Sequence, residues 1–323
     1  MSGPTILPFD EAATAAAATS INAGGIVAVP TETVYGLAAD ATNAQAVARI
    51  YAAKGRPSFN PLIVHVPDLA AAERFAMFDP QARDLAEAFW PGPLTLVLPV
   101  RAQAGLAPAV TAGLATVAMR VPAHRAMRAL LAACGKPLAA PSANRSGAIS
   151  PTTAEHVAAS LGPAAPLIID DGPCPAGVES TIVMNGRVLR PGPITAEAIA
   201  ALCSRAGGSL DSQEPFHEPL GSRLRGSTKV TAPGQLDSHY APGKPLRLNA
   251  TAAEPDEWLI GFGPVTGDDT LSAAGNLTEG AARLFAALHR ADTAPKRRIA
   301  VAPVPAIGLG VAINDRLRRA AWG

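Results

Sequence analysis

The sequence has few of the features that mark secreted, membrane or metal-thiolate proteins. Its three cysteines, Cys134, Cys174 and Cys203, are far apart and include no C-x-x-C pair, so neither a disulfide framework nor a thiolate zinc site is expected. No uninterrupted apolar stretch approaches the ~18 residues that a spanning helix needs. No Lys or Arg precedes Arg49, which argues against a secretory signal. We therefore expect a cytoplasmic protein with reduced thiols and no membrane association.

Charge is also scarce. Charged residues make up 16% of the 323 residues and the formal net charge is +1, so the bulk electrostatic footprint of a nucleic-acid-binding protein is missing. One segment departs from this balance, because residues 88–154 contain no Asp or Glu. A local anion site is therefore expected there. The basic residues of this segment are Arg101, Arg120, Arg125, Arg128, Lys136 and Arg145.

Several familiar motifs of nucleotide and metal enzymes are absent as well. The sequence contains no Gly-x-x-x-x-Gly-Lys-Ser/Thr, no Gly-x-Gly-x-x-Gly after a strand, no His-Glu-x-x-His and no Gly-x-Ser-x-Gly. These absences exclude the standard P-loop, dinucleotide-binding and zincin interpretations. Any chemistry must come from a different arrangement of residues.

The pattern that is present predicts an α/β protein with two domains. Apolar residues make up 48% of the chain, which suits a packed core. Short β-branched runs alternate with Ala-rich helical stretches over the first two hundred residues, which favours a mixed sheet with flanking helices. We place a first domain at 1–207, a Gly-, Ser- and Pro-rich linker at 208–245 and a small α/β domain at 246–323. Strands are expected at 25–29, 62–66, 94–99, 116–121, 138–140, 167–170, 181–183, 258–262 and 298–302.

Two polar segments adjoin predicted strands in the first hundred residues. The strand at 25–29 opens into a polar, aromatic loop that carries Thr31, Thr33 and Tyr35, and α/β sheets bind ligands at such strand ends. The alternative is a turn cap formed by Thr31 and its neighbour Glu32.

The second segment begins where a predicted helix ends. Lys54, Arg56 and Asn60 fall within one short loop, and guanidinium and ammonium groups make charge-assisted bonds to phosphate oxygens. Ordinary capping of the helix C-terminus explains the two cations equally well. His65 lies in the strand that follows, where a core histidine is as plausible as a ligand.

Three further segments each end or begin a predicted strand. Arg120 closes an apolar strand and must find an anion or solvent, with a surface ion pair as the alternative. Ser142 and Asn144 follow the strand at 138–140, where hydroxyls and backbone N–H groups can form a phosphate cradle or an ordinary turn. Ser180 and Arg190 stand at the ends of a predicted hairpin. Each pattern is weak alone.

Together, in this order, the five patterns resemble the YrdC-like domain of the threonylcarbamoyl-AMP synthase family. The segment from Gly308, GLGVAINDRLRRAA, resembles the C-terminal domain of the family's longer form, and PGQLDSHYAP, from Pro233, is similar to its linker motif. The resemblance implies a YrdC-like twisted mixed sheet with flanking helices, plus a smaller Rossmann-like α/β C-terminal domain. It covers essentially the whole chain.

The resemblance also implies an activity. Members of this family are nucleotidyltransferases that condense L-threonine, bicarbonate and ATP, with Mg²⁺ accompanying ATP, into threonylcarbamoyl-adenylate and pyrophosphate. A tRNA threonylcarbamoyltransferase then passes the group to the adenosine beside the anticodon of tRNA, and a weak direct contact with tRNA is a further expectation. A dedicated metal site in the protein is not expected.

By similarity, each quoted residue receives a role. The residues expected to act in catalysis are Lys54 and Arg56. Those expected to bind ATP are Lys54, Arg56, Asn60, Ser142, Asn144, Arg190 and Tyr240. Those expected to surround threonine are Thr31, Thr33, Tyr35, His65, Arg120 and Ser180, with Arg120 as the partner of its carboxylate.

Two other functions compete, and one segment carries a separate hypothesis. A non-enzymatic RNA-binding module is weakened by the near-zero charge. Carbamoyl-adenylate synthesis of the hydrogenase-maturation type is weakened because the zinc-finger cysteine clusters of that family are missing. The linker, which ends in His239 and Tyr240, is expected to fold over the nucleotide site as a lid that excludes water.

Overall fold

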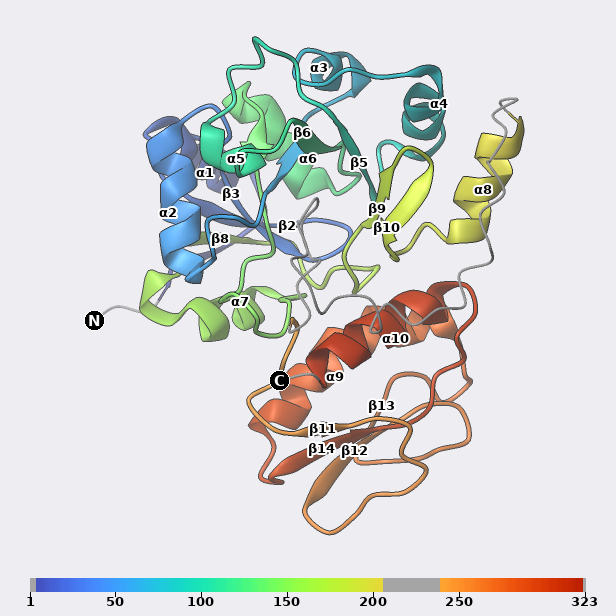
Figure 1. Ribbon diagram of the computed structural model, residues 1–323. Helices are drawn as coiled ribbons and strands as arrows, with labels where there is room; N and C mark the ends of the chain where they lie inside the picture. The colour runs from blue at the N-terminus through green and yellow to red at the C-terminus, as the bar shows by residue number, and fades with distance from the viewer. Residues whose placement is uncertain (1–3, 206–238, 322–323) are drawn as a thin grey trace.

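The computed structural model describes residues 4–205 and 239–321. Within 4–205, ten strands form one mixed sheet in the order β1-β8-β2-β3-β7-β4-β6-β5-β9-β10 (Figure 1). The sheet contains parallel pairs such as β4 with β6 and antiparallel pairs such as β2 with β3. The strands are β1 Ile6–Pro8, β2 Val27–Pro30, β3 Tyr35–Asp40, β4 Ile63–His65, β5 Leu94–Pro99, β6 Thr116–Arg120, β7 Leu138–Ala139, β8 Leu167–Asp170, β9 Thr181–Met184 and β10 Arg187–Arg190.

The helices of this first part begin at polar caps and pack on both faces of the sheet. Side chains of Asp10, Asn43 and Thr153 accept bonds from backbone N–H groups of the helices that follow them, which satisfies donors that a helix N-terminus leaves unpaired. Helices α1 and α6 share one core cluster with one face of the central strands, and α2 and α4 share another with the opposite face. The helices are α1 Glu11–Asn22, α2 Ala44–Lys54, α3 Leu69–Glu73, α4 Pro80–Phe89, α5 Pro108–Thr111, α6 Arg125–Cys134, α7 Ala154–Leu161 and α8 Ala196–Arg205.

The polar loop predicted after the strand at 25–29 is much shorter than the sequence suggests. Residues 31–34 turn the chain, and Tyr35–Asp40 then forms β3, which pairs antiparallel with β2 in the register Pro30↔Tyr35. This segment contains Gly, Leu and Ala in place of β-branched residues, so strand propensity does not mark it. Tertiary pairing and complete burial select the strand.

Residues 246–320 build a second, smaller α/β unit. Four short strands there form an all-parallel sheet in the order β11-β14-β12-β13. Two helices cover one face of it and lie between this sheet and the large one (Figure 1). This pair of sheets confirms the predicted fold class. The elements are β11 Leu246–Arg247, β12 Glu257–Gly261, β13 Asp269–Thr270, α9 Leu277–Thr293, β14 Arg298–Val301 and α10 Leu309–Ala320.

The two units are tightly packed against each other. Val34 and Val178 of the first unit share a core cluster with Phe285 of α9. At Gly177, where φ is +67°, a Cβ atom would stand 2.3 Å from the carbonyl oxygen of Ala281, so only glycine permits the observed approach.

Two histidines also stack across the contact between the two units. The rings of His156 on α7 and His289 on α9 have centroids 3.9 Å apart and planes inclined by 16°. His289 Nε2 also lies 3.1 Å from the carbonyl oxygen of Ser150.

In the part of the chain that the structure describes, no helix combines the length and apolarity that crossing a membrane requires.

Candidate functional site

Polar side chains from both halves of the chain meet in one pocket. Its walls come from the turn between β2 and β3, the ends of β4 and β6, the segment after β7, the segment before β9 and the end of β10. His239 and Tyr240, which lead into the small unit, close another side. Its free volume is about 50 Å³, far below the ~300 Å³ or more of ordinary ligand pockets.

Most of the predicted site residues line this pocket. It is lined by Thr31, Thr33, Arg56, His65, Arg120, Ser142, Ser180, Arg190 and Tyr240 from the predicted set, and also by Glu179 and His239. The remaining predicted residues lie behind the wall. They are Tyr35, Lys54, Asn60 and Asn144.

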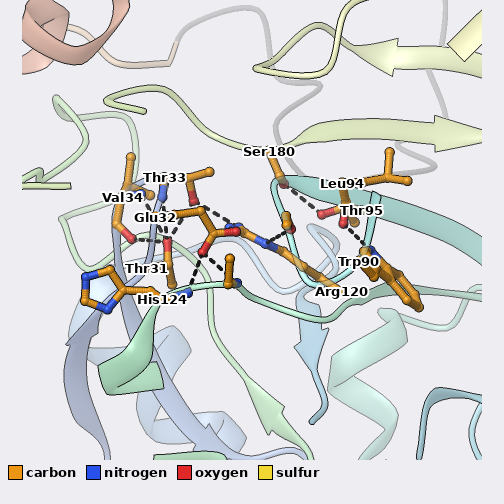
Figure 2. Close-up of polar contacts among 12 residues, drawn as sticks. Thr31, Glu32, Thr33, Val34, Trp90, Leu94, Thr95, Arg120, His124 and Ser180 are labelled. Carbon is orange, nitrogen blue, oxygen red and sulfur yellow. Dashed lines mark hydrogen bonds and ion pairs between the residues drawn. The ribbon is translucent and has the colours of Figure 1, made fainter. Parts of the chain in front are cut away.

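Arg120 is the centre of one half of the pocket (Figure 2). One of its terminal nitrogens donates to Thr33 Oγ1 at 2.9 Å and the other to Glu32 Oε1 at 2.6 Å, while Nε donates to the carbonyl of Gly92. Burial would raise the pKa of Glu32, but Arg120 outweighs it and the pKa is lowered. A guanidinium has five N–H donors, so two N–H groups of Arg120 have no partner among these contacts. The ion pair foreseen as the alternative exists, but it is buried.

The hydroxyls around Arg120 are held in fixed positions. Thr31 Oγ1 donates to the carbonyl of Val34 and accepts from two backbone N–H groups, so it caps the turn. It also lies 2.8 Å from Thr33 Oγ1. On the opposite side, Ser180 Oγ lies 2.7 Å from Thr95 Oγ1 (Figure 2). Thr31 therefore forms the turn cap, as the alternative interpretation expected, and it also lines the pocket.

His65 stands beside Arg120, since β4 and β6 pair in parallel with His65 opposite Arg120. Its side chain is buried and Nδ1 has no hydrogen-bond partner. Burial, and then the charge of Arg120, lower its pKa to about 3. The ring is therefore neutral near pH 7 and can accept or donate one hydrogen bond toward the pocket.

The other half of the pocket holds buried cations that form no ion pair with any described carboxylate. Arg56 donates to the carbonyls of Asn60 and Pro61, and Arg190 donates to the carbonyl and hydroxyl of Ser180. Burial lowers the pKa of Arg56 to about 10 and also lowers that of Arg190. Within residues 4–205 and 239–321, neither arginine forms an ion pair. Since an unpaired buried charge is costly, these groups favour an anion as their missing partner.

Lys54 supports the pocket from behind. Its side chain is 3% exposed, and Nζ donates to the carbonyls of Ser142 and Asn144. Burial, and then the charge of Arg56, lower its pKa well below the ordinary value. The lysine thus fixes the backbone of the Ser142 loop from a buried position.

The other predicted residues outside the pocket wall have different surroundings. Asn144 donates from Nδ2 to the carbonyl of Ala148 at 2.7 Å. The Tyr35 hydroxyl lies 3.1 Å from Asp170 Oδ1, so the structure does not bring it to the pocket. Asn60 is completely buried and both atoms of its side-chain amide lack a partner.

Three residues of the site were missing from the predicted set. Glu32 and Glu179 each stand beside a predicted residue in sequence, and His239 precedes Tyr240. Their role depends on partners far away along the chain, such as Arg120 for Glu32. In the described ranges, no group of three or more His, Cys, Asp or Glu side chains is placed to hold a metal ion.

The chain is similar to known proteins over nearly its whole length. Residues 19–192 match a family model described as telomere recombination, and residues 194–322 match one described as threonylcarbamoyl-AMP synthase, C-terminal domain. Threonylcarbamoyl-AMP synthase of Bacillus subtilis is 41% identical over 96% of this chain and 93% of its own length, and that of Pyrococcus abyssi is 38% identical over 94% and 92%. The crystal structure of P. abyssi Sua5 complexed with L-threonine superposes with a TM-score of 0.83 at 34% identity, covering 99% of this chain and 98% of that one. The chain belongs to the threonylcarbamoyl-AMP synthase family, and its likeness to that family extends over both domains.

Proposed function

We propose that this protein is a nucleotidyltransferase that makes threonylcarbamoyl-AMP and pyrophosphate from L-threonine, bicarbonate and ATP. The observation that carries the proposal is the division of the pocket into two halves. One half offers Arg120 with hydroxyls and a neutral imidazole, and the other offers Arg56 and Arg190, which form no ion pair with a described residue. The first suits an amino acid and the second a polyphosphate. A relative crystallised with L-threonine supports threonine as a substrate.

The chemistry needs positioning and charge more than proton transfer. The threonine amine and bicarbonate give N-carboxy-threonine and water, and one carboxylate oxygen of this carbamate attacks the α-phosphorus of ATP. The bond between that phosphorus and the bridging oxygen breaks, and pyrophosphate leaves with the electron pair. A carbamate is already a nucleophile, so orientation by Arg120, Thr33 and Ser180 suffices. Arg56 and Arg190 stabilise the charge that grows on the leaving group.

Mg²⁺ enters, in this proposal, as part of the MgATP substrate. The two carboxylates nearest the pocket are both engaged by arginines, Glu32 by Arg120 and Glu179 by Arg316. The phosphate oxygens are therefore the ligands we assign to the ion, which would offset charge on the leaving pyrophosphate.

The product and its use follow from its chemistry. A mixed anhydride with AMP is readily hydrolysed, so a tRNA threonylcarbamoyltransferase must take it up and transfer the group to the adenosine beside the anticodon. A weak contact between this protein and tRNA would bring the product closer to the adenosine that receives the group. This use would place the protein in the cytoplasm.

The decisive experiment measures pyrophosphate release with MgATP while threonine and bicarbonate are supplied together or singly. We expect release only when both are present, with serine a poorer substrate because the threonine methyl contributes roughly 1 kcal/mol in a closed pocket. Equal release with carbamoyl phosphate in place of both would favour carbamoyl-adenylate synthesis. Filter binding of tRNA without ATP, in the absence of any release, would favour an RNA-binding module.

A further inference from the structure

Arg316, an arginine of the small domain, reaches the wall of the pocket. Arg316 on α10 has no solvent exposure, and its Nε donates to Glu179 Oε2 at 2.7 Å. A terminal nitrogen lies 3.4 Å from the carbonyl oxygen of Glu179, and the other donates to Asp315 at 2.8 Å. The contact between Arg316 and Glu179 joins residues 137 positions apart in sequence. It belongs to none of the sequence patterns from which substrate-binding residues were predicted.

Glu179 is a buried charge beside the cations assigned to the polyphosphate. It lines the same pocket as Arg56 and Arg190, and its other carboxylate oxygen accepts from the hydroxyl of Ser150. Burial would raise its pKa, but Arg316 and then Arg190 outweigh burial and lower it. Glu179 in turn acts on Lys54 and Arg190, where it opposes the fall in pKa that burial causes. The carboxylate is therefore ionised and within electrostatic reach of those cations.

Arg316 also packs against the residue that closes the pocket. Its guanidinium carbon lies 5.3 Å from the centre of the Tyr240 ring, within the range of a cation–π contact. Tyr240 has a φ of +67°, which is uncommon for a residue with a side chain, and its hydroxyl has no hydrogen-bond partner. One guanidinium thus contacts two parts of the pocket wall.

Loss of Arg316 would change the position or the protonation of the Glu179 carboxylate. A buried carboxylate that loses its cation must find another or be protonated. The cations that it already influences are Arg190 and Lys54. If Glu179 turned toward Arg190, it would occupy N–H groups that a polyphosphate needs and would repel the phosphates themselves.

We propose that Arg316 is a positioning residue for the nucleotide site, which holds the Glu179 carboxylate away from Arg190 and so keeps the cationic half of the pocket open to polyphosphate. The proposal rests on the proposed function, since it assigns that half of the pocket to ATP. It also gives the small domain a part in substrate binding. A simpler role, in which Arg316 only joins the two domains, makes the opposite prediction for one double variant.

The experiment compares Arg316→Gln, Glu179→Gln and the double variant by calorimetric titration with MgATP and, separately, with L-threonine. We expect Arg316→Gln to weaken MgATP binding at least tenfold while the threonine Kd stays within twofold. Glu179→Gln should bind MgATP as tightly as the wild type or more tightly. The double variant should return to within about threefold of the wild type, because no charge remains to be held.

A matched control tests whether loss of any ion pair in the small domain is enough to weaken MgATP binding. Arg247→Gln removes a guanidinium that pairs with the buried carboxylate of Glu257, but neither residue lines the pocket. It should leave MgATP binding unchanged.

The results of these titrations distinguish a failure of this inference from a failure of the proposed function. A double variant that binds MgATP no better than Arg316→Gln, or a Glu179→Gln variant that binds it as poorly as Arg316→Gln, would overturn the inference. If Arg316→Gln does not fold, Glu179→Gln alone decides, since a joining role predicts weaker binding and the proposed role does not. Failure of the proposed function shows differently, as a wild-type protein that releases no pyrophosphate with threonine and bicarbonate.

Discussion

Lys54 shows how one side chain can support a site from behind its wall. The ammonium group is buried behind the wall and donates to the carbonyls of Ser142 and Asn144, whose loop contributes Ser142 to the pocket. Arg56, two positions later, lines the pocket itself. The two cations look equivalent in sequence, but the structure places Lys54 behind the pocket wall and Arg56 in the wall.

Replacing Lys54 should therefore affect both folding and turnover. We expect Lys54→Ala to lower the free energy of unfolding by about 2–4 kcal/mol, because two carbonyls lose a charge-assisted donor and a cavity forms. Lys54→Met, which keeps most of the volume, separates the two causes and should lose about half of that amount. Urea unfolding and pyrophosphate release measure both effects. Lost turnover with unchanged unfolding would instead mean that Lys54 contacts the substrate directly.

At the level of elements, the sequence predicts those strands whose residues favour a strand by themselves. β5 and β8 lie at the predicted positions, and β9 ends one residue beyond the prediction. β3 was missed because its Gly- and Ala-rich sequence acquires strand structure only through pairing with β2 and β7. Short elements such as β11 and β13 have two residues each, too few for any periodicity.

The residues of the candidate site, like the strands, were predictable only where the sequence carries a local signal. Residues at strand ends, such as Arg120 and Ser142, could be identified because a polar residue after an apolar run is a local signal. The pairing of Arg120 with Glu32, or of Arg316 with Glu179, involves residues 88 and 137 positions apart. No local pattern carries that information. Which carboxylate pairs with each arginine depends on which strands and helices become neighbours in the fold.

The short segment at His239 and Tyr240 gives a prediction of its own. The predicted lid at 208–245 lies largely in residues 206–238, outside the described residues, but these two side chains line the pocket. We expect the double replacement by Ala to lower the yield of threonylcarbamoyl-AMP severalfold and to raise ATP hydrolysis without product, because water then reaches the intermediate. Chromatography of products from one reaction measures both. A wild-type yield would reject the lid and leave the segment as a tether.

Gly177 provides a test of the packing between the domains. Gly177→Ala places a Cβ 2.3 Å from the carbonyl oxygen of Ala281 and also requires a strained φ, so a loss of about 3–5 kcal/mol in unfolding free energy is expected. Gly172→Ala is the matched control, because its φ is +78° but nothing lies within 4 Å of the added Cβ. Only the backbone cost of about 1–2 kcal/mol should remain there. Equal losses in the two variants would contradict close packing at Gly177.

At the scale of the whole molecule, buried histidines make the fold sensitive to acid. Burial lowers the pKa of His65, His156 and His239 to about 3 each, whereas an unfolded histidine titrates near 6.5. Between these values the unfolded chain binds more protons than the folded one, so stability is complete above pH 6.5 and falls as the pH decreases toward 3. Each ring contributes about 1 kcal/mol between pH 7.5 and 5.5.

We therefore expect the free energy of unfolding to fall by about 3 kcal/mol between pH 7.5 and 5.5. Urea titrations at several pH values measure this change. His156→Gln, which removes one ring of the stacked pair between the domains, should reduce the drop by somewhat less than a third because His156 is partly exposed. A stability that stays level or rises toward pH 5.5 would show that these rings are not held neutral.

The ion pair between Glu179 and Arg316 also limits how the gene can change. A shortened gene that encodes only the first domain would lose Arg316, and Glu179 would keep its negative charge beside the pocket without the cation that balances it. If the inference above holds, such a shortening would bind polyphosphate best with a neutral residue at position 179 or with a new cation from the first domain. Exchange of either domain by recombination would then be expected to preserve this pair of charges.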